Sequence, residues 1–120
     1  MKKIIIAEDD KFLGQAYRLK LTNSGFSVLV VNDGQQLLDQ IEEFAPDLII
    51  LDLVMPVLDG FSALEKIKSN PLLKNLPVII ASNLGQKEDI DRTKALGVAD
   101  FVVKSDLSLT ELVDKINKLL

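Results

Sequence analysis

Residues that could do chemistry follow four of the five apolar runs in this sequence. They are Glu8, Asp9 and Asp10 after the first run, Asp52 after the third, Ser82 and Asn83 after the fourth, and Lys104 after the fifth. The chain has no Cys and no His, which excludes disulfides, thiolate metal sites and imidazole bases. The available chemistry therefore rests on carboxylates, hydroxyls and lysine amines.

Three of these carboxylates would meet at one place if the first and third apolar runs were neighbouring strands. Glu8, Asp9 and Asp52 could not then crowd together without neutralisation, so either one takes up a proton, with a raised pKa, or a cation binds. Mg²⁺ is the natural ion, because it prefers oxygen, accepts few protein carboxylates and keeps several waters. Ca²⁺ would need more protein oxygens than this set offers.

A hydroxyl and an amine complete the set at the next two strand ends. Lys104 would bring a movable positive charge and Ser82 a hydrogen-bond donor, and together they would surround an anion held on Asp52. This inventory matches phosphoryl transfer, in which the protein positions the group and neutralises its charge. Asp52 would be the nucleophile, since a carboxylate can attack phosphorus and form a mixed anhydride.

The five apolar runs are typical of strands buried on both faces, as in a parallel sheet flanked by helices. They cover residues 3–7, 27–31, 48–51, 78–81 and 101–103. The stretches between them carry apolar stripes at helical spacing. These stripes are Leu13, Ala16, Tyr17 and Leu21; Leu37, Leu38, Ile41 and Ala45; Ala63, Leu64 and Ile67; and Leu109, Leu112, Val113, Ile116 and Leu120.

Local signals refine this reading of the elements. Residues 87–96 have the weakest apolar stripe, and Ser108 with Glu111 predicts a capping box before the last helix. A βα unit repeated five times predicts right-handed crossovers and an open parallel sheet. In such sheets ligands bind beyond the carboxyl ends of the strands, where the candidate residues lie.

Length and composition describe an ordinary folded domain. The chain has 120 residues, of which 48% are hydrophobic and 27% charged, and its formal charge at pH 7 is −4. This charge argues against direct nucleic-acid binding, which usually requires a concentrated basic face. No apolar run approaches the ~20 residues of a membrane span. The N-terminal stretch also lacks the run of ~7 to 15 apolar residues that a signal peptide needs. We therefore expect a cytoplasmic protein without membrane contact.

The order of these motifs resembles the receiver domain of two-component response regulators. The match runs from "IIIAEDD" through "LIILDLVMPVLDG" and "PVIIASN" to "ADFVVKS", and so covers essentially the whole chain. The resemblance implies an α/β, flavodoxin-like (βα)5 fold, with strand order 2-1-3-4-5 and helices on both faces of a doubly wound parallel sheet. Residues 1–120 would form one receiver domain with no output domain, either a stand-alone regulator or an excised part of a longer one.

The resemblance implies a role for each residue near the phosphoryl group. Asp52 would be the phosphoacceptor for a sensor histidine kinase or a histidine phosphotransfer protein. Ser82 would be the hydroxyl that follows the phosphoryl group, and Lys104 the lysine that pairs with it. Phe101 would be the aromatic switch residue that turns inward, although by composition it is equally well a core residue of its strand.

The resemblance also implies a set of Mg²⁺ ligands. Besides Asp52, Asp9 would bind directly, Glu8 through water, and Val54 through its backbone carbonyl. Asp10 is better explained as the start of the first helix, whose positive end favours a carboxylate. Asp59 and Gly60 would make the turn that leads into the third helix.

The residue after Lys104 departs from the family pattern. Relatives usually carry Pro there, commonly after a cis bond, whereas this chain has Ser105. A cis bond before a non-proline residue would cost about 3 to 4 kcal/mol. We therefore expect a trans bond, with Lys104 held less firmly than in relatives.

Other departures concern access to the phosphoacceptor. Asn83 stands where relatives mostly carry a small residue, and it could either narrow the approach to the site or bond to the phosphoryl group. Val54 and Leu84, each two residues beyond a site residue, are apolar at positions that tune hydrolysis of the acyl phosphate in this family. Two apolar groups disfavour an ordered water, so we expect a long-lived phosphorylated state.

Three functions are compatible with these residues. The first is a signalling switch that catalyses its own phosphorylation and slow dephosphorylation, is not a metabolic enzyme, and is read by a protein partner or a separate output domain. It would be a monomer or a phosphorylation-dependent dimer. The second is an aspartate-nucleophile phosphatase, which normally carries Asp-x-Asp, whereas Val54 cannot act as the second, acidic residue. The third is a pseudo-receiver that only binds proteins.

Overall fold

The computed structural model describes residues 1–120 as five strands alternating with five α-helices. The strands are β1 (Lys3–Ala7), β2 (Ser27–Val31), β3 (Leu48–Leu51), β4 (Val78–Ser82) and β5 (Asp100–Val103). The helices are α1 (Lys11–Asn23), α2 (Gly34–Phe44), α3 (Gly60–Ser69), α4 (Lys87–Ala95) and α5 (Leu109–Leu119), with a short 3₁₀ helix η1 (Lys104–Asp106). All five predicted strands are present, each within one residue of its expected bounds.

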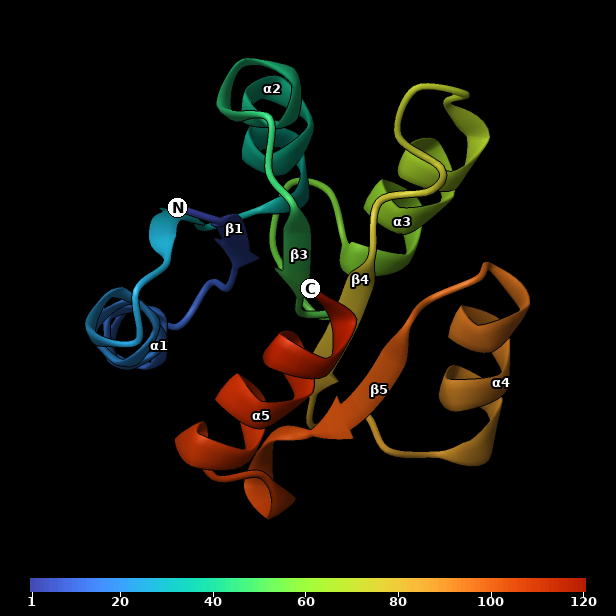
Figure 1. The fold of residues 1–120 in the computed structure, drawn as a ribbon. Coiled ribbons are helices and arrows are strands. Elements are labelled where there is room, and N and C mark those ends of the chain that lie inside the picture. Colours follow the sequence, from blue (N-terminus) through green and yellow to red (C-terminus); the bar gives the residue numbers. More distant parts are fainter.

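The strands form one parallel sheet in the order β2-β1-β3-β4-β5. The flavodoxin-like strand order implied by the resemblance is therefore confirmed. Strand order reverses at β1, because the chain moves outward to β2 and then returns past β1 to β3 (Figure 1). The crevice at this reversal lies beyond the carboxyl ends of β1 and β3, where ligands bind in open α/β sheets.

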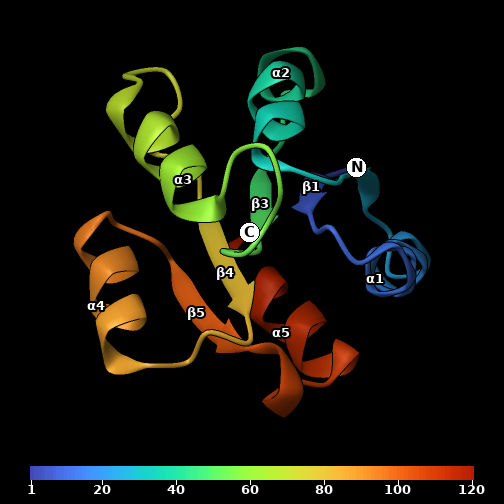
Figure 2. The same cartoon turned by 180° about the vertical axis from the view of Figure 1, so that it is seen from behind.

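Alternate strand residues point into two separate hydrophobic cores. Ile5 and Ile49 face the core made with α2 and α3, whereas Ile4 and Ile50 face the core made with α1 and α5. Helices α1 and α5 thus cover one face, and α2, α3 and α4 lie on the other (Figures 1 and 2). Burial on both faces explains why the strands are apolar almost without interruption.

Side-chain caps begin four of the five α-helices. The carboxylates of Asp10, Asp33 and Asp59 each accept an N–H from the first turn of α1, α2 and α3. Ser108 accepts the Glu111 N–H at 3.1 Å, and its hydroxyl donates to the Glu111 carboxylate. The predicted roles of Asp10 and Asp59 are confirmed, as is the Ser108 cap, whereas Glu111 accepts from the Ser108 hydroxyl and not from the backbone N–H that a full capping box requires.

Two helices differ in how well their apolar stripes were predicted. Ala45, expected within the stripe of α2, instead follows the helix as an exposed C-cap with a φ of 52°. The chain leaves the helix there because Pro46 disfavours helical backbone in the residue before it. Thr93 is the one buried residue of α4, which confirms the weak stripe expected for that segment. No helix is long and apolar enough to cross a membrane.

Candidate functional site

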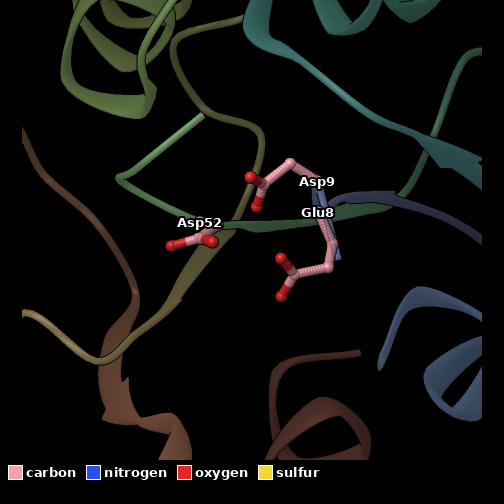
Figure 3. Close-up of side chains that lie close together, drawn as sticks. All are labelled: Glu8, Asp9 and Asp52. Carbon is pink, nitrogen blue, oxygen red and sulfur yellow. The ribbon is translucent and has the colours of Figure 1, made fainter. Parts of the chain in front are cut away.

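Pairing of β1 with β3 brings the predicted acidic residues together. Ala7 lies opposite Leu51, and the Asp52 N–H donates to the Ala7 carbonyl at 3.0 Å, so Asp52 sits beside the end of β1. One carboxylate oxygen from each of Glu8, Asp9 and Asp52 lies within 4.8 Å of the others. Figure 3 shows the three side chains directed toward one space. We call these three residues the acidic cluster.

The predicted lysine and hydroxyl approach from the next two strands. Lys104, which directly follows β5, places its Nζ 2.8 Å from Asp52 Oδ2 and also pairs with Glu8 Oε1. Ser82, at the end of β4, is buried, and its Oγ accepts the Leu84 N–H at 3.2 Å. The structure therefore places Asp52 and Lys104 in direct contact.

An open pocket of about 380 Å³ holds these groups. It is lined by Glu8, Asp9, Asp10, Asp52, Val54, Ser82, Asn83, Leu84 and Lys104. Asp52 is 5% exposed, whereas Val54 is 56% and Leu84 38% exposed. The acceptor is thus recessed, while the two apolar residues singled out in the sequence lie where the pocket opens to solvent.

Phe101 lies outside this pocket lining. It belongs to β5, is half-buried, and packs against the core on the side of α2 and α3. This position agrees with the composition-based expectation that Phe101 is a core residue. Its switching role stays a prediction.

Burial and neighbouring charges perturb two groups of the site. Burial raises the pKa of Glu8 to about 7, and the Asp52 charge adds to this, although hydrogen bonding to Lys104 and to the Asp10 N–H opposes it. Burial alone would lower the pKa of the Lys104 amine, but its contacts with Asp52 and Glu8 outweigh this and raise it. A shared proton or a cation is what such crowded carboxylates require.

The residues fit a hard divalent cation. The acidic cluster carries three formal negative charges against the single positive charge of Lys104. Apart from its ion pair with Lys104, the buried Glu8 Oε1 has no hydrogen-bond partner. Carboxylate oxygens without nitrogen or sulfur donors suit Mg²⁺ rather than a transition metal.

Residues 52–59, between β3 and α3, are called here the acceptor loop. Two glycines let neighbouring backbone approach this loop closely. The Gly60 N–H donates to the Leu53 carbonyl at 3.0 Å, and a Cβ on Gly60 would collide with the Asp52 carbonyl and lie 2.6 Å from Leu53 Cα. The Gly34 N–H donates to the Leu58 carbonyl at 2.9 Å, which ties the same loop to α2. These contacts hold the segment after Asp52 from both sides.

Two residues that depart from the family pattern take definite positions. No peptide bond in the structure is cis, so the bond between Lys104 and Ser105 is trans, as expected. Asn83 is exposed and lines the pocket. From this position Asn83 can reach the approach to Asp52, and its two expected effects, a narrower approach or a bond to a phosphoryl group, stay predictions.

Sequence reasoning missed one polar residue beside the site. Asn32 follows β2, the one strand whose end was not considered, and its Nδ2 donates to the Glu8 carbonyl at 3.1 Å. The available signal was its position, because an Asn directly after an apolar run of an α/β sheet lies at the edge where ligands bind.

Comparisons with known proteins agree with this geometry. The family model described as "response regulator receiver domain" matches residues 4–117. A protein-glutamate methylesterase/protein-glutamine glutaminase of Syntrophomonas wolfei is 37% identical over 108 residues, which are 86% of this chain and 30% of that protein. The chain spans about half the length, or less, of the curated relatives it matches.

Solved structures of receiver proteins match the whole fold. The receiver domain of the Francisella response regulator 1452 has a TM-score of 0.90 and 33% identity, over 99% of this chain and 96% of that one. The phosphorylated cyanobacterial phytochrome response regulator RcpA has a TM-score of 0.83 and 34% identity, over 98% of this chain and 90% of that one.

Proposed function

Because the chain belongs to the family of response regulator receiver domains, we propose that it is a phosphorylation-dependent signalling switch with Asp52 as phosphoacceptor. Receiver domains are signalling modules rather than metabolic enzymes, and they bind Mg²⁺ at an acidic pocket. The observation that carries the proposal is the recessed Asp52 carboxylate, 2.8 Å from the Lys104 amine and beside two further acids. A similar protein, the cyanobacterial RcpA, has been crystallised in a phosphorylated form.

The chemistry would be an in-line transfer from a phosphohistidine of a sensor histidine kinase or a histidine phosphotransfer protein. An Asp52 carboxylate oxygen attacks phosphorus, the P–N bond breaks, and the imidazole leaves with the electron pair and takes up a proton. Lys104 moves from the Asp52 carboxylate to a phosphoryl oxygen and keeps its charge. The open pocket of about 380 Å³ leaves room for the transferred phosphoryl group.

The acidic cluster, with the Val54 backbone carbonyl, would hold a Mg²⁺ ion. The bound ion supplies charge neutralisation between the acceptor carboxylate and the phosphoryl oxygens. Asp9, which is exposed, would bind the ion directly, and Glu8, which is buried, would act through water. With a cation held there, Glu8 would stay ionised without taking up a proton.

The response to phosphorylation would pass through Ser82 and Phe101. The Ser82 Oγ accepts the Leu84 N–H, and its O–H would donate to a phosphoryl oxygen. Phe101, in the neighbouring strand β5, would then turn inward. The resulting population shift is read by a protein partner or a separate output domain on the surface of α4, β5 and α5, without direct contact of this chain with nucleic acid.

Transfer of a phosphoryl group from acetyl phosphate tests this function. The chain is incubated with acetyl phosphate, with and without Mg²⁺, and its intact mass is measured. A gain of one phosphoryl group is expected for the wild type with Mg²⁺ and for Asp91→Asn, an exposed control on α4, but not for Asp52→Asn. No gain in any chain would favour the pseudo-receiver alternative, and a gain in Asp52→Asn would mean a different acceptor.

A further inference from the structure

Asn32 completes the sheet at the point where backbone pairing stops. The ladder between β1 and β2 ends at Ala7 and Val31, and the Glu8 N–H still donates to the Val31 carbonyl at 2.9 Å. In a parallel ladder the Glu8 carbonyl would next accept the N–H of Asp33. However, Asp33 is the N-cap of α2, where the chain turns away. The Asn32 side chain supplies the donor instead, with Nδ2 at 3.1 Å from the carbonyl.

The first turn of α2 holds Asn32 in place. The Asn32 N–H donates to Gln36 Oε1 at 3.0 Å, and the Gln36 N–H donates to Asp33 Oδ1 at 2.8 Å. The adjacent Gly34 N–H donates to the Leu58 carbonyl of the acceptor loop. The start of α2 therefore holds the Asn32 backbone in place. The Asn32 side-chain amide can in turn hold the Glu8 carbonyl.

We propose that Asn32 is a positioning residue for the acidic cluster. Its amide holds the peptide plane between Glu8 and Asp9, and this plane sets the directions in which both side chains leave β1. The proposal rests on the function proposed above, because it assigns a supporting residue to the same site. Asn32 is absent from the residues that line the pocket, so it acts through Glu8 and Asp9 and not on the reacting atoms.

Asn32 should affect the affinity of the site for Mg²⁺ and not the rate of phosphoryl transfer once Mg²⁺ is bound. Asp52 is held by the Ala7 carbonyl, the Val54 N–H and Lys104, and all three contacts are independent of Asn32. Loss of the amide would let the Glu8–Asp9 peptide rotate, which disperses two of the three carboxylates. Loss of a hydrogen bond that orients a metal ligand typically weakens metal affinity about 10-fold to 100-fold. Because Asn32 acts on the backbone, we expect the lower end of this range.

The test measures Mg²⁺ affinity by calorimetry on the intact chain, and separately the rate of phosphoryl uptake from acetyl phosphate as Mg²⁺ is varied. Asn32→Ala should weaken Mg²⁺ binding about 10-fold while leaving the uptake rate at saturating Mg²⁺ within about twofold of the wild type. Asn32→Gln, which keeps an amide donor, should restore part of the affinity. Gln36→Ala, which frees Asn32 without touching the acidic cluster, should give a smaller loss in the same direction.

Asn70→Ala is the matched control, because the Asn70 side chain also makes one hydrogen bond, with the Leu72 N–H at 2.9 Å, but lies at the far end of α3 from Gly60. It should leave Mg²⁺ affinity unchanged. Unchanged affinity in Asn32→Ala, or an equal loss in Asn70→Ala, would overturn the proposal. A wild type that binds no Mg²⁺ and takes up no phosphoryl group would instead overturn the function on which it rests.

Discussion

At the scale of single residues, the acceptor is defined by its two charged neighbours. The Lys104 amine lies between Asp52 and Glu8, so in the absence of a cation it neutralises part of both carboxylates. Burial raises the pKa of Glu8 to about 7, against the opposing hydrogen bonds from Lys104 and the Asp10 N–H. Three carboxylates against one lysine favour a cation, and Lys104 together with that cation would offset the additional negative charge that a phosphoryl group brings.

Val54 sets a prediction about the lifetime of the phosphorylated state. Its exposed, apolar side chain at the pocket mouth cannot hold a water in line with the acyl phosphate. Replacing it in Val54→Asn offers an amide that can orient such a water, so the phosphoryl group should be lost several-fold faster than from the wild type. The measurement is loss of radiolabel after the donor is removed.

Val57→Asn is the control for this prediction. Val57 lies in the same loop and is 81% exposed, but it does not line the pocket. It should therefore leave the decay unchanged. If the label decays faster from the wild type than from Val54→Asn, the assigned role of Val54 is wrong.

At the scale of elements, the start of α3 supports the acceptor loop. Gly60 is the first residue of α3 and lies against the Asp52 and Leu53 backbone, while the Asp59 carboxylate caps the helix through the Ser62 N–H at 2.9 Å. The same hydrogen bond is the largest cause of the lowered pKa of Asp59. Cap and glycine together decide where the loop after Asp52 ends.

The lowered pKa of Asp59 predicts how stability depends on pH. Its ordinary value is 3.8, and because the folded value is lower, the carboxylate contributes stability above about pH 4 that is lost as pH falls through the folded pKa. Asp59→Asn keeps an N-cap oxygen but does not titrate. Thermal melting from pH 7 to pH 2.5 should therefore show the wild type losing stability relative to Asp59→Asn below pH 4.

Asp59→Ala should lose about 1 kcal/mol at neutral pH, since it removes the N-cap altogether. A difference between wild type and Asp59→Asn that stays constant down to pH 2.5 would show that the carboxylate is not stabilised by this cap. The measurement is thermal melting of the wild type, Asp59→Asn and Asp59→Ala at one protein concentration across this pH range.

At the scale of the whole molecule, α4 is the helix least anchored in the core. Thr93 is its one buried residue, and no side chain caps its start. Arg92 ties it to α3, because its guanidinium lies 4.0 Å from the centre of the Phe61 ring and 3.1 Å from Glu65 Oε1. These half-exposed contacts therefore decide much of how α4 is held.

Loss of this tether should loosen α4 without unfolding the domain. Arg92→Gln removes the ion pair and the cation–π contact, together worth about 1 kcal/mol at an exposed site. Hydrogen exchange of the α4 amides should become several-fold faster, while exchange in β1 and β3 stays unchanged. Lys94→Gln, an exposed lysine of the same helix, should leave exchange as in the wild type. Equal protection of α4 in Arg92→Gln would show that the tether is not what holds the helix.

The sequence by itself determined the strands, the starts of α1, α3 and α5, and the chemical character of the site. These features are local: apolar runs, caps such as Asp10 and Ser108, and polar residues directly after strands can be recognised within a few positions. Ala45 was placed wrongly because helical spacing alone does not show where the left-handed C-cap falls.

Only the tertiary structure decided which of these groups touch. Lys104 contacts Asp52 across 52 residues, Arg92 contacts Glu65 across 27, and Asn32 contacts Glu8 across 24. Such contacts depend on strand register and on where each chain segment turns away from the sheet. The spacing of nearby residues predicts neither of these. The sequence thus identified the acidic cluster, but the fold placed Asn32 behind it.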